Sequence, residues 1–310
     1  MTTSPFVDAS QAPTSFPSDA HVATDTPLGA PDSDPTRTRT TGVQGRAALW
    51  AATTRATLRT LAAWLPALAL LAALIALWQW YASQPQIDAE ILPTPLAIWR
   101  VLVAQRGILW ANTLVTLNET AVGFGAALAT GLAFGALIDA SPWLRRALYP
   151  LLVTSQTIPI IALAPLLVLW FGFGLTSKAI VIALVCFFPI TVAFADGLRS
   201  ADPDLIRLYR SFGAGRLRIF WSVRLPGSLP TLFSGVRIAV AYSMIGAIFG
   251  EYVGAVAGLG YYIELKQHSF ATAGVLAAIA VVAALSVALF ALVALIERLA
   301  LPWYYAQRRA

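Results

Sequence analysis

The stretch AGVLAAIAVVAALSVALFALVALI, residues 273–296, contains 24 residues without one charged side chain. At about 1.5 Å of rise per residue, a helix of this length reaches roughly 36 Å. That length exceeds the ~30 Å hydrocarbon core of a bilayer. The stretch is therefore typical of a transmembrane helix.

Five further apolar runs precede it. The first, Leu61–Tyr81, is 21 residues long, which makes it a full span rather than the short core of a secretory signal. The other four are Leu114–Ile138, Ala147–Trp170, Ala179–Asp196 and Leu232–Val253. Because unpaired backbone groups cannot face lipid, such runs must form helices. We therefore expect an all-α membrane protein with six transmembrane helices.

The composition agrees with this class. Of the 310 residues, 58% are hydrophobic and 12% are charged, against about 25% charged in soluble domains. The basic residues behind the net charge of +6 lie in loops between apolar runs, which favours a role in membrane orientation and not a nucleic-acid partner. The only cysteine is Cys186 and the two histidines lie apart, so no disulfide and no metal site are expected.

Arginine and lysine indicate the orientation. Seventeen of them lie in the N-terminal region, the second-to-third loop, the fourth-to-fifth loop region and the C-terminus. Only four lie on the opposite side, namely Arg100, Arg106, Lys178 and Lys266. The positive-inside rule then places both termini in the cytoplasm.

The regions outside the spans also differ in character. Residues 1–45 are rich in Pro, Ser, Thr and Asp, so we expect a disordered cytoplasmic tail and a transmembrane domain over 46–310. Residues 82–112 form an outward segment with a short amphipathic piece near Leu96–Val103. Gly131 and Gly135 form a small-xxx-small pair that predicts close helix packing.

The longest connection, Arg199–Pro230, has 32 residues, and loops of that size usually carry function. It predicts two amphipathic helices near Pro203–Phe212 and Arg216–Val223, separated by the glycine-rich turn GAG at 213–215. Pro226 and Pro230 are expected to end the second helix before the next span begins. The pattern fits a helix pair lying on anionic headgroups as well as one that docks into a partner protein.

This loop carries a specific resemblance. Gly213, nine intervening residues and then VRLP at 223–226 resemble the EAA motif, the cytoplasmic signature of permease subunits in ATP-binding-cassette (ABC) importers. Where that motif has the three residues that name it, this chain has Arg207, Leu208 and Tyr209. The resemblance covers about residues 90–300 and implies a type I importer permease with a cytoplasmic coupling-helix loop at 199–230.

The resemblance also implies partners. The loop would dock into a cytoplasmic ABC ATPase subunit through Leu205, Arg207, Leu208, Arg210, Phe212, Gly213, Ala214, Val223, Leu225 and Pro226. An extracytoplasmic solute-binding protein and a second permease copy would complete the importer in a bacterial inner membrane. The sequence has no G-x-x-x-x-G-K-[ST] run, so ATP and Mg²⁺ are expected on the ATPase, with no cofactor and no catalysis on this chain.

The third span contains TSQTIP at 154–159, which predicts a broken helix facing a cavity because freed backbone groups need protein or water partners. The residues expected along a translocation path are Ser155, Gln156, Thr157, Pro159, Phe188, Tyr242 and Ser243. Hydrogen bonding between helices is the alternative role for each of them.

Two other functions are alternatives to an importer permease. An ion-coupled secondary transporter or channel subunit would need ionisable groups at mid-membrane, whereas Glu119, Asp196 and Glu251 are expected near the membrane interfaces. A membrane-embedded enzyme would need a His, Asp or Ser constellation at one membrane face, which the sequence does not offer.

The substrate implied by the resemblance is a small polar solute. LVTLNET at 114–120 and YSMIG at 242–246 look more like the permeases for thiamine-precursor pyrimidines and riboflavin than those for sulfonates, taurine or nitrate. Selection would then reside mainly in the binding protein.

Overall fold

A computed structural model of the chain describes residues 65–307. The chain divides into two units at Ala67, and almost all described residues belong to the second, Leu68–Ala310. The tail predicted over 1–45 and the start of the first predicted span lie outside the described residues.

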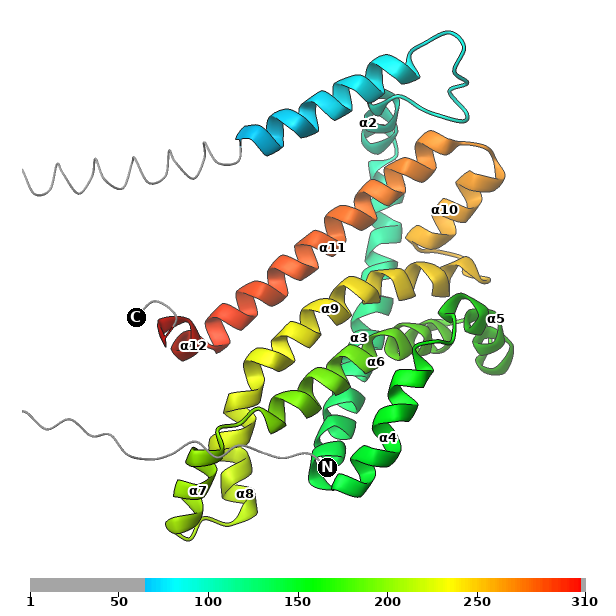
Figure 1. The fold of residues 1–310 in the computed structure, drawn as a ribbon. Helices are drawn as coiled ribbons and strands as arrows, with labels where there is room; N and C mark the ends of the chain where they lie inside the picture. Colours follow the sequence, from blue (N-terminus) through cyan, green and yellow to red (C-terminus); the bar gives the residue numbers. More distant parts are fainter. Residues whose placement is uncertain (1–64, 308–310) are drawn as a thin grey trace, which may run out of the picture. The chain divides into compact units, whose positions relative to one another are not determined.

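Every regular element in the described residues is a helix (Figure 1). A helix over Leu65–Ala82 comes first. It is followed by α2 Pro95–Ala104, α3 Arg106–Ala140, α4 Pro142–Ser155, α5 Ile160–Phe171, α6 Leu175–Arg199, α7 Pro203–Ser211, α8 Arg216–Ile219, a π-helical turn Phe220–Arg224, α9 Leu225–Tyr252, α10 Leu259–His268, α11 Thr272–Ala300 and α12 Pro302–Gln307.

Five of the described helices are long and apolar enough to cross a membrane, and α4 with α5 makes a sixth if that bent pair counts as one span. The expected all-α fold with six spans is therefore confirmed in outline. The span α3 starts eight residues before the predicted Leu114. On α11, none of the most apolar stretch is buried within the chain, as expected for a helix that faces lipid or another subunit.

The predicted break in the third span is present. The axes of α4 and α5 differ by 98° across the link between Ser155 and Ile160. Pro159 immediately precedes α5. Because proline has no N–H and its ring obstructs the preceding turn, a straight helix cannot pass easily through this point.

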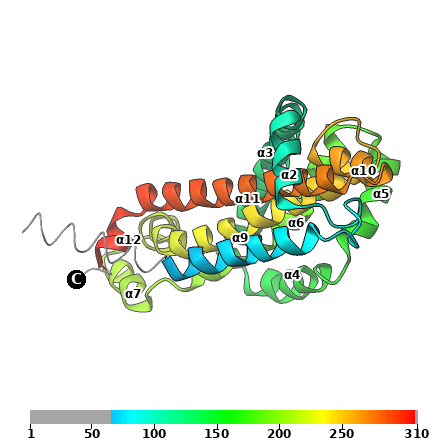
Figure 2. The same ribbon diagram turned by 90° about the horizontal axis from the view of Figure 1, so that it is seen from above.

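The centre of the second unit is α6, which packs against both α3 and α9. The three helices lie side by side in Figures 1 and 2. Ile182, Cys186, Ile190, Phe194 and Leu198, one turn apart on α6, are buried. They form the main apolar core with Ala127 from α3 and Leu232, Val236 and Ala239 from α9.

Glycines on α3 allow this close approach. A Cβ atom built on Gly123 would lie 2.6 Å from Cβ of Ile182, and one on Gly131 would lie 2.8 Å from Cγ2 of Ile190. A Cβ on Gly135 would lie 2.8 Å from the ring of Phe194. The close packing predicted from the small-residue pair is confirmed.

The expectation that Pro226 and Pro230 end a helix is wrong. A continuous helical segment runs from Arg216 to Tyr252 and carries both prolines. The π-helical turn ends at Arg224, two residues before Pro226, and there the Leu225 N–H donates to the Phe220 carbonyl, five residues back. Such a wide turn displaces the carbonyls that a proline ring would otherwise meet, so the chain stays helical.

The packed helices α6 and α9 have different elements at their two ends. Figures 1 and 2 show α7 and α8 at one end of α6 and α9, and α5 and α10 at the other. The predicted amphipathic piece near Leu96–Val103 is confirmed as α2, whereas α10 was not anticipated.

Gly123→Ala should destabilise the protein, because the added methyl group meets Ile182 and the Ala179 carbonyl oxygen at 2.8 Å. We expect a cost of about 1–3 kcal/mol, seen as a lower unfolding temperature of the detergent-solubilised chain. The matched control is Gly125→Ala on the same helix, where an added Cβ meets nothing within 4 Å. That control should be neutral or stabilising by up to about 1 kcal/mol, and equal losses in both variants would contradict the packing argument.

Candidate functional site

The connection between α6 and α9 folds into a helical hairpin, residues 202–224, which we call the α7–α8 hairpin. Asp202 caps α7 by accepting a hydrogen bond from the Asp204 N–H at 2.8 Å. The chain reverses at Gly213, whose φ of +75° favours glycine. The Ala214 N–H then donates to the Tyr209 carbonyl at 3.0 Å, and α8 begins at Arg216. The two helices predicted from the sequence are confirmed, although α8 passes directly into the π-helical turn.

One side of the α7–α8 hairpin is a small apolar core. Ala201, Ile219 and Val223 are buried there, with Ile206 and Tyr209 packed against them. A salt bridge of 2.6 Å between Arg224 and Asp139 fixes the base of the hairpin to the end of α3. The Asp139 side chain is only 6% exposed, so this pair holds the hairpin in one orientation.

The other side carries apolar residues in the open. Phe212 is 79% exposed, Leu217 72% and Trp221 61%, and Leu205 and Leu208 are about half exposed. Large exposed apolar groups gathered on one short element mark an interaction surface. Leu217 and Trp221 were not predicted, although their four-residue spacing places them on one helical face.

The predicted coupling residues divide into two groups. Leu205, Arg207, Leu208, Arg210, Phe212 and Gly213 are exposed. Ala214, Leu225 and Pro226 are half-buried and Val223 is buried. Ala214 and Val223 belong to the hairpin, and Leu225 and Pro226 begin α9. Six of the ten residues are thus accessible to a partner, and four are not fully accessible.

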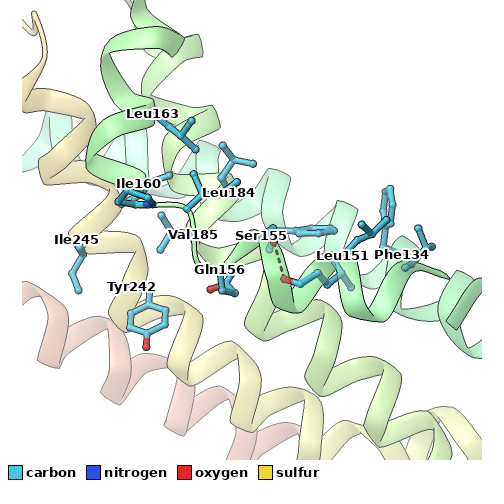
Figure 3. Close-up of a pocket in the computed structure, with 15 residues that line it drawn as sticks. Phe134, Leu151, Ser155, Gln156, Ile160, Leu163, Leu184, Val185, Tyr242 and Ile245 are labelled. Carbon is cyan, nitrogen blue, oxygen red and sulfur yellow. Dashed lines mark hydrogen bonds between the residues drawn. The ribbon is translucent and has the colours of Figure 1, made fainter. Parts of the chain in front are cut away.

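A cavity of about 600 Å³ lies where α4 breaks into α5 (Figure 3). Phe134 from α3, Val185 and Phe187 from α6 and Tyr242 from α9 form further parts of its wall. The rings of Phe134 and Phe187 meet edge to face, 5.3 Å apart. None of the described residues that line this cavity is charged.

Four predicted path residues, Ser155, Gln156, Pro159 and Tyr242, line this cavity. Thr157, Phe188 and Ser243 do not belong to its lining. Thr157 donates to the Thr154 carbonyl, and the fully buried Ser243 donates to the Val240 carbonyl at 2.7 Å. Phe187 lies in the wall instead of its neighbour Phe188, because adjacent helical residues point about 100° apart.

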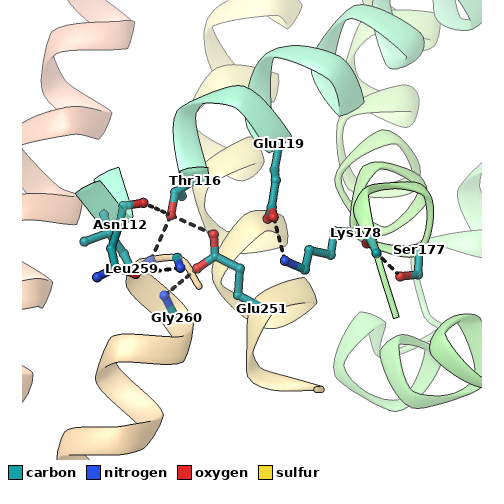
Figure 4. A network of polar contacts seen from close by, with 10 residues as sticks. Asn112, Thr116, Glu119, Ser177, Lys178, Glu251, Leu259 and Gly260 are labelled. Carbon is teal, nitrogen blue, oxygen red and sulfur yellow. Dashed lines mark hydrogen bonds and ion pairs between the residues drawn. The ribbon is translucent and has the colours of Figure 1, made fainter. Parts of the chain in front are cut away.

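A buried polar network joins α3, α9 and α10 (Figure 4). Glu251, fully buried at the end of α9, accepts from the Thr116 hydroxyl at 2.6 Å and from the Gly260 N–H at 2.5 Å. The Thr116 oxygen accepts from the Leu259 N–H at 2.9 Å, and Asn112 accepts from the Gly258 N–H at 2.8 Å. The start of α10 is therefore held by side chains of α3 and α9.

A second buried contact lies beside it. Lys178 of α6 and Glu119 of α3 form a salt bridge of 2.5 Å, and their side chains are 10% and 6% exposed. Glu119 lies thirteen residues after the first residue of α3, about 20 Å along the helix, so it belongs to the interior of that helix. Nothing in the local sequence pairs residues 59 positions apart, which explains why this contact was missed.

Thr116→Val should cost about 1–3 kcal/mol, because it leaves the Glu251 carboxylate and the Leu259 N–H without a shared buried partner. The measurement is thermal unfolding of the purified chain. Thr113→Val is the matched control, since that buried hydroxyl bonds only to the Leu109 carbonyl of its own helix. Equal effects of the two substitutions would contradict a special role for Thr116.

Comparisons with known proteins agree with this geometry. Residues 122–301 match the family of binding-protein-dependent transport system inner membrane components. The chain is 39% identical to the riboflavin transport system permease protein RibX of Chloroflexus aurantiacus, over 74% of this chain and 87% of the relative. It is 38% identical to the formylaminopyrimidine transport permease protein ThiX of Halalkalibacterium halodurans, over 69% and 86%. It is 31% identical to the taurine transport system permease protein TauC of Escherichia coli, over 76% and 88%.

The fold is shared with a solved transporter. An inward-facing structure of the MetNI methionine ABC transporter matches with a TM-score of 0.56 and 21% identity, over 63% of this chain and 97% of that one. The family match covers more than half of the present chain, and the relatives extend the similarity over most of it. The chain therefore belongs to the binding-protein-dependent transport system inner membrane components and is a permease subunit of an ABC importer.

Proposed function

We propose that the α7–α8 hairpin couples this permease to a separate cytoplasmic ATPase. The observation that carries the proposal is that five large apolar side chains of the hairpin are exposed, namely Leu205, Leu208, Phe212, Leu217 and Trp221. An apolar centre with a charged rim is the usual composition of a protein interface. Arg207, Arg210 and Arg216 are exposed and supply such a rim.

The connection of the hairpin to the bundle suits it to transmit motion. The second arm continues without interruption into α9, so that Arg216–Tyr252 is one helical segment. Tyr242 and Ile245 of that segment line the cavity at the break in the third span. A displacement imposed on the hairpin would therefore reach the wall of the cavity through one rigid element.

The remaining parts of the importer belong to the same proposal. We assign ATP and Mg²⁺ to the ATPase, and no cofactor and no catalytic role to this chain. A homodimer of permeases would carry one hairpin for each ATPase subunit, and an extracytoplasmic binding protein would deliver the solute. Both termini and the hairpin would face the cytoplasm of a bacterial cell, in agreement with the excess of basic residues on that side.

The ion-coupled transporter finds less support. Glu119, Lys178, Glu251 and Glu297 are buried ionisable groups that such a mechanism would recruit. Glu297 forms a salt bridge of 3.3 Å with Arg237. Lys178 and Glu119 are bonded to each other, and Glu251 is bonded to α3 and α10. These contacts fit a structural role that holds helices together.

The cavity favours one group of substrates. Its described lining is apolar and aromatic, with Ser155, Gln156 and Tyr242 as polar groups and no cation. Nitrate, taurine and other sulfonates carry an anionic group, which is costly to bury without a charged partner. A neutral, flat ring can stack on aromatic walls and hydrogen-bond to a few amide and hydroxyl groups. We therefore propose a pyrimidine thiamine precursor or a riboflavin-like solute.

Leu208→Glu should lower ATPase co-purification and solute uptake tenfold or more, because it places a carboxylate in an apolar contact. Membrane insertion and the unfolding temperature should not change, since Leu208 is 49% exposed. Gly213→Pro should have the same effect on coupling, because proline fixes φ near −65° where the backbone needs +75°. Val256→Glu, at an 88% exposed site beyond the other end of α9, is the control. Normal uptake with Leu208→Glu would refute the coupling role.

Uptake of labelled riboflavin or formylaminopyrimidine into cells should be insensitive to equal concentrations of taurine or nitrate. Tyr242→Ala should reduce that uptake severalfold, because it removes an aromatic wall of the cavity. Tyr81→Ala, at an exposed position outside the cavity lining, should not. Uptake of taurine or nitrate without uptake of either ring compound would overturn the substrate assignment and leave the coupling role intact.

A further inference from the structure

A second pocket lies where α4 begins and α6 ends, and the function described above does not use it. It has a volume of about 580 Å³ and is lined by Pro142, Arg145, Arg146, Tyr149, Pro150 and Arg199. We call it the arginine pocket. None of its described lining residues belongs to the cavity at the α4–α5 break.

The arginine pocket has an excess of positive charge. The carboxylate of Asp196 forms a salt bridge of 2.8 Å with Arg145 and accepts a long hydrogen bond of 3.5 Å from the Tyr149 hydroxyl. Among the described residues, neither Arg146 nor Arg199 forms an ion pair. Two guanidinium groups from different helices therefore share one pocket, and no described carboxylate forms an ion pair with either of them.

Arg145 supplies a further unmatched donor. Its Nη1 atom is buried and has no hydrogen-bond partner among the described residues, although its Nη2 atom bonds to Asp196. The guanidinium carbon lies 5.0 Å from the centre of the Tyr149 ring, which keeps the group in place. A buried donor without an acceptor is costly and calls for an explanation. Because this atom is buried, a ligand in the open pocket cannot reach it, so the case for an anion rests on the charges of Arg146 and Arg199.

The location indicates which anion is available. The apolar helices α3 and α6 end at Ala140 and Arg199, and α4 begins at Pro142, so the pocket lies where apolar helices stop. Trp143, in the first turn of α4, is 73% exposed. Exposed tryptophan beside helix ends is typical of the level of the lipid headgroups. Phosphate groups are the anions present at that depth.

We infer that the arginine pocket binds a phosphate group, and that its source is an anionic phospholipid of the adjoining leaflet. Arg146 on α4 and Arg199 on α6 contact the phosphate. Arginine suits this ligand because its planar group donates two parallel hydrogen bonds to phosphate oxygens. The bound lipid links the start of the broken span to the end of the central helix.

The test uses the full chain, purified in a non-ionic detergent and freed of lipid. Its affinity for dioctanoylphosphatidylglycerol, dioctanoylphosphatidylcholine and inorganic phosphate is measured by calorimetric titration. We expect preference for phosphatidylglycerol over the zwitterionic lipid. Arg146→Gln with Arg199→Gln should weaken phosphatidylglycerol binding about 30-fold, from the loss of two charges near a lipid phosphate. Asp196→Asn should strengthen it about fivefold, because it removes the competing carboxylate.

The control is Arg100→Gln with Arg218→Gln, which removes the same charge at two exposed positions outside the pocket and should leave binding unchanged. Arg146→Gln alone changes one exposed side chain and should leave the fold intact, so weaker binding by this variant reports on the pocket and not on unfolding. If inorganic phosphate binds as tightly as phosphatidylglycerol, and the pocket variants weaken both to the same extent, the pocket binds phosphate but its ligand is free phosphate and not a lipid. Absence of binding to either compound, or equal losses in the pocket and control variants, would overturn the inference.

Discussion

The close packing of α6 against α3 and α9 is the contact on which the rest of the structure depends. Side chains one turn apart on α6 meet a stripe of glycines on α3, where no Cβ atom would fit without displacement. In a membrane, helices gain little from burying apolar surface against each other, so van der Waals contact at short range must hold them. The cavity, the buried salt bridge and the arginine pocket all include residues of α6.

The polar contacts are placed at the two ends of this central packing. Toward α10, Glu251 and Thr116 fix the turn that follows α9. Toward the hairpin, Arg224 and Asp139 fix the element that precedes α9. The helix α9 is thus anchored at both ends by buried or half-buried groups, while its middle faces the cavity through Tyr242. Such an element moves as a unit and carries displacement along its length.

Much of the fold could be predicted from the sequence because lipid imposes long apolar helices with few charges. The break before Pro159 and the reversal at Gly213 could be predicted for a different reason, because proline and glycine have specific backbone requirements. The early start of α3 could not be predicted from the sequence, because polar residues such as Asn112 interrupt the apolar run there. In the folded chain Asn112 accepts a hydrogen bond from the Gly258 N–H at the start of α10. The partners of Lys178 and Glu251 are also distant in sequence, and no local pattern specifies them.

The π-helical turn at Phe220–Arg224 has a consequence for the angular relation between the hairpin and the membrane. One wide turn inserts about one extra residue into the helix and shifts everything after it by roughly 100°. The exposed face of α8 and the face of α9 that lines the cavity therefore point in directions that differ by this extra rotation about the helix axis. Removal of a single residue from this turn would restore regular winding and would misalign the two faces, although every side chain on either of them would be retained.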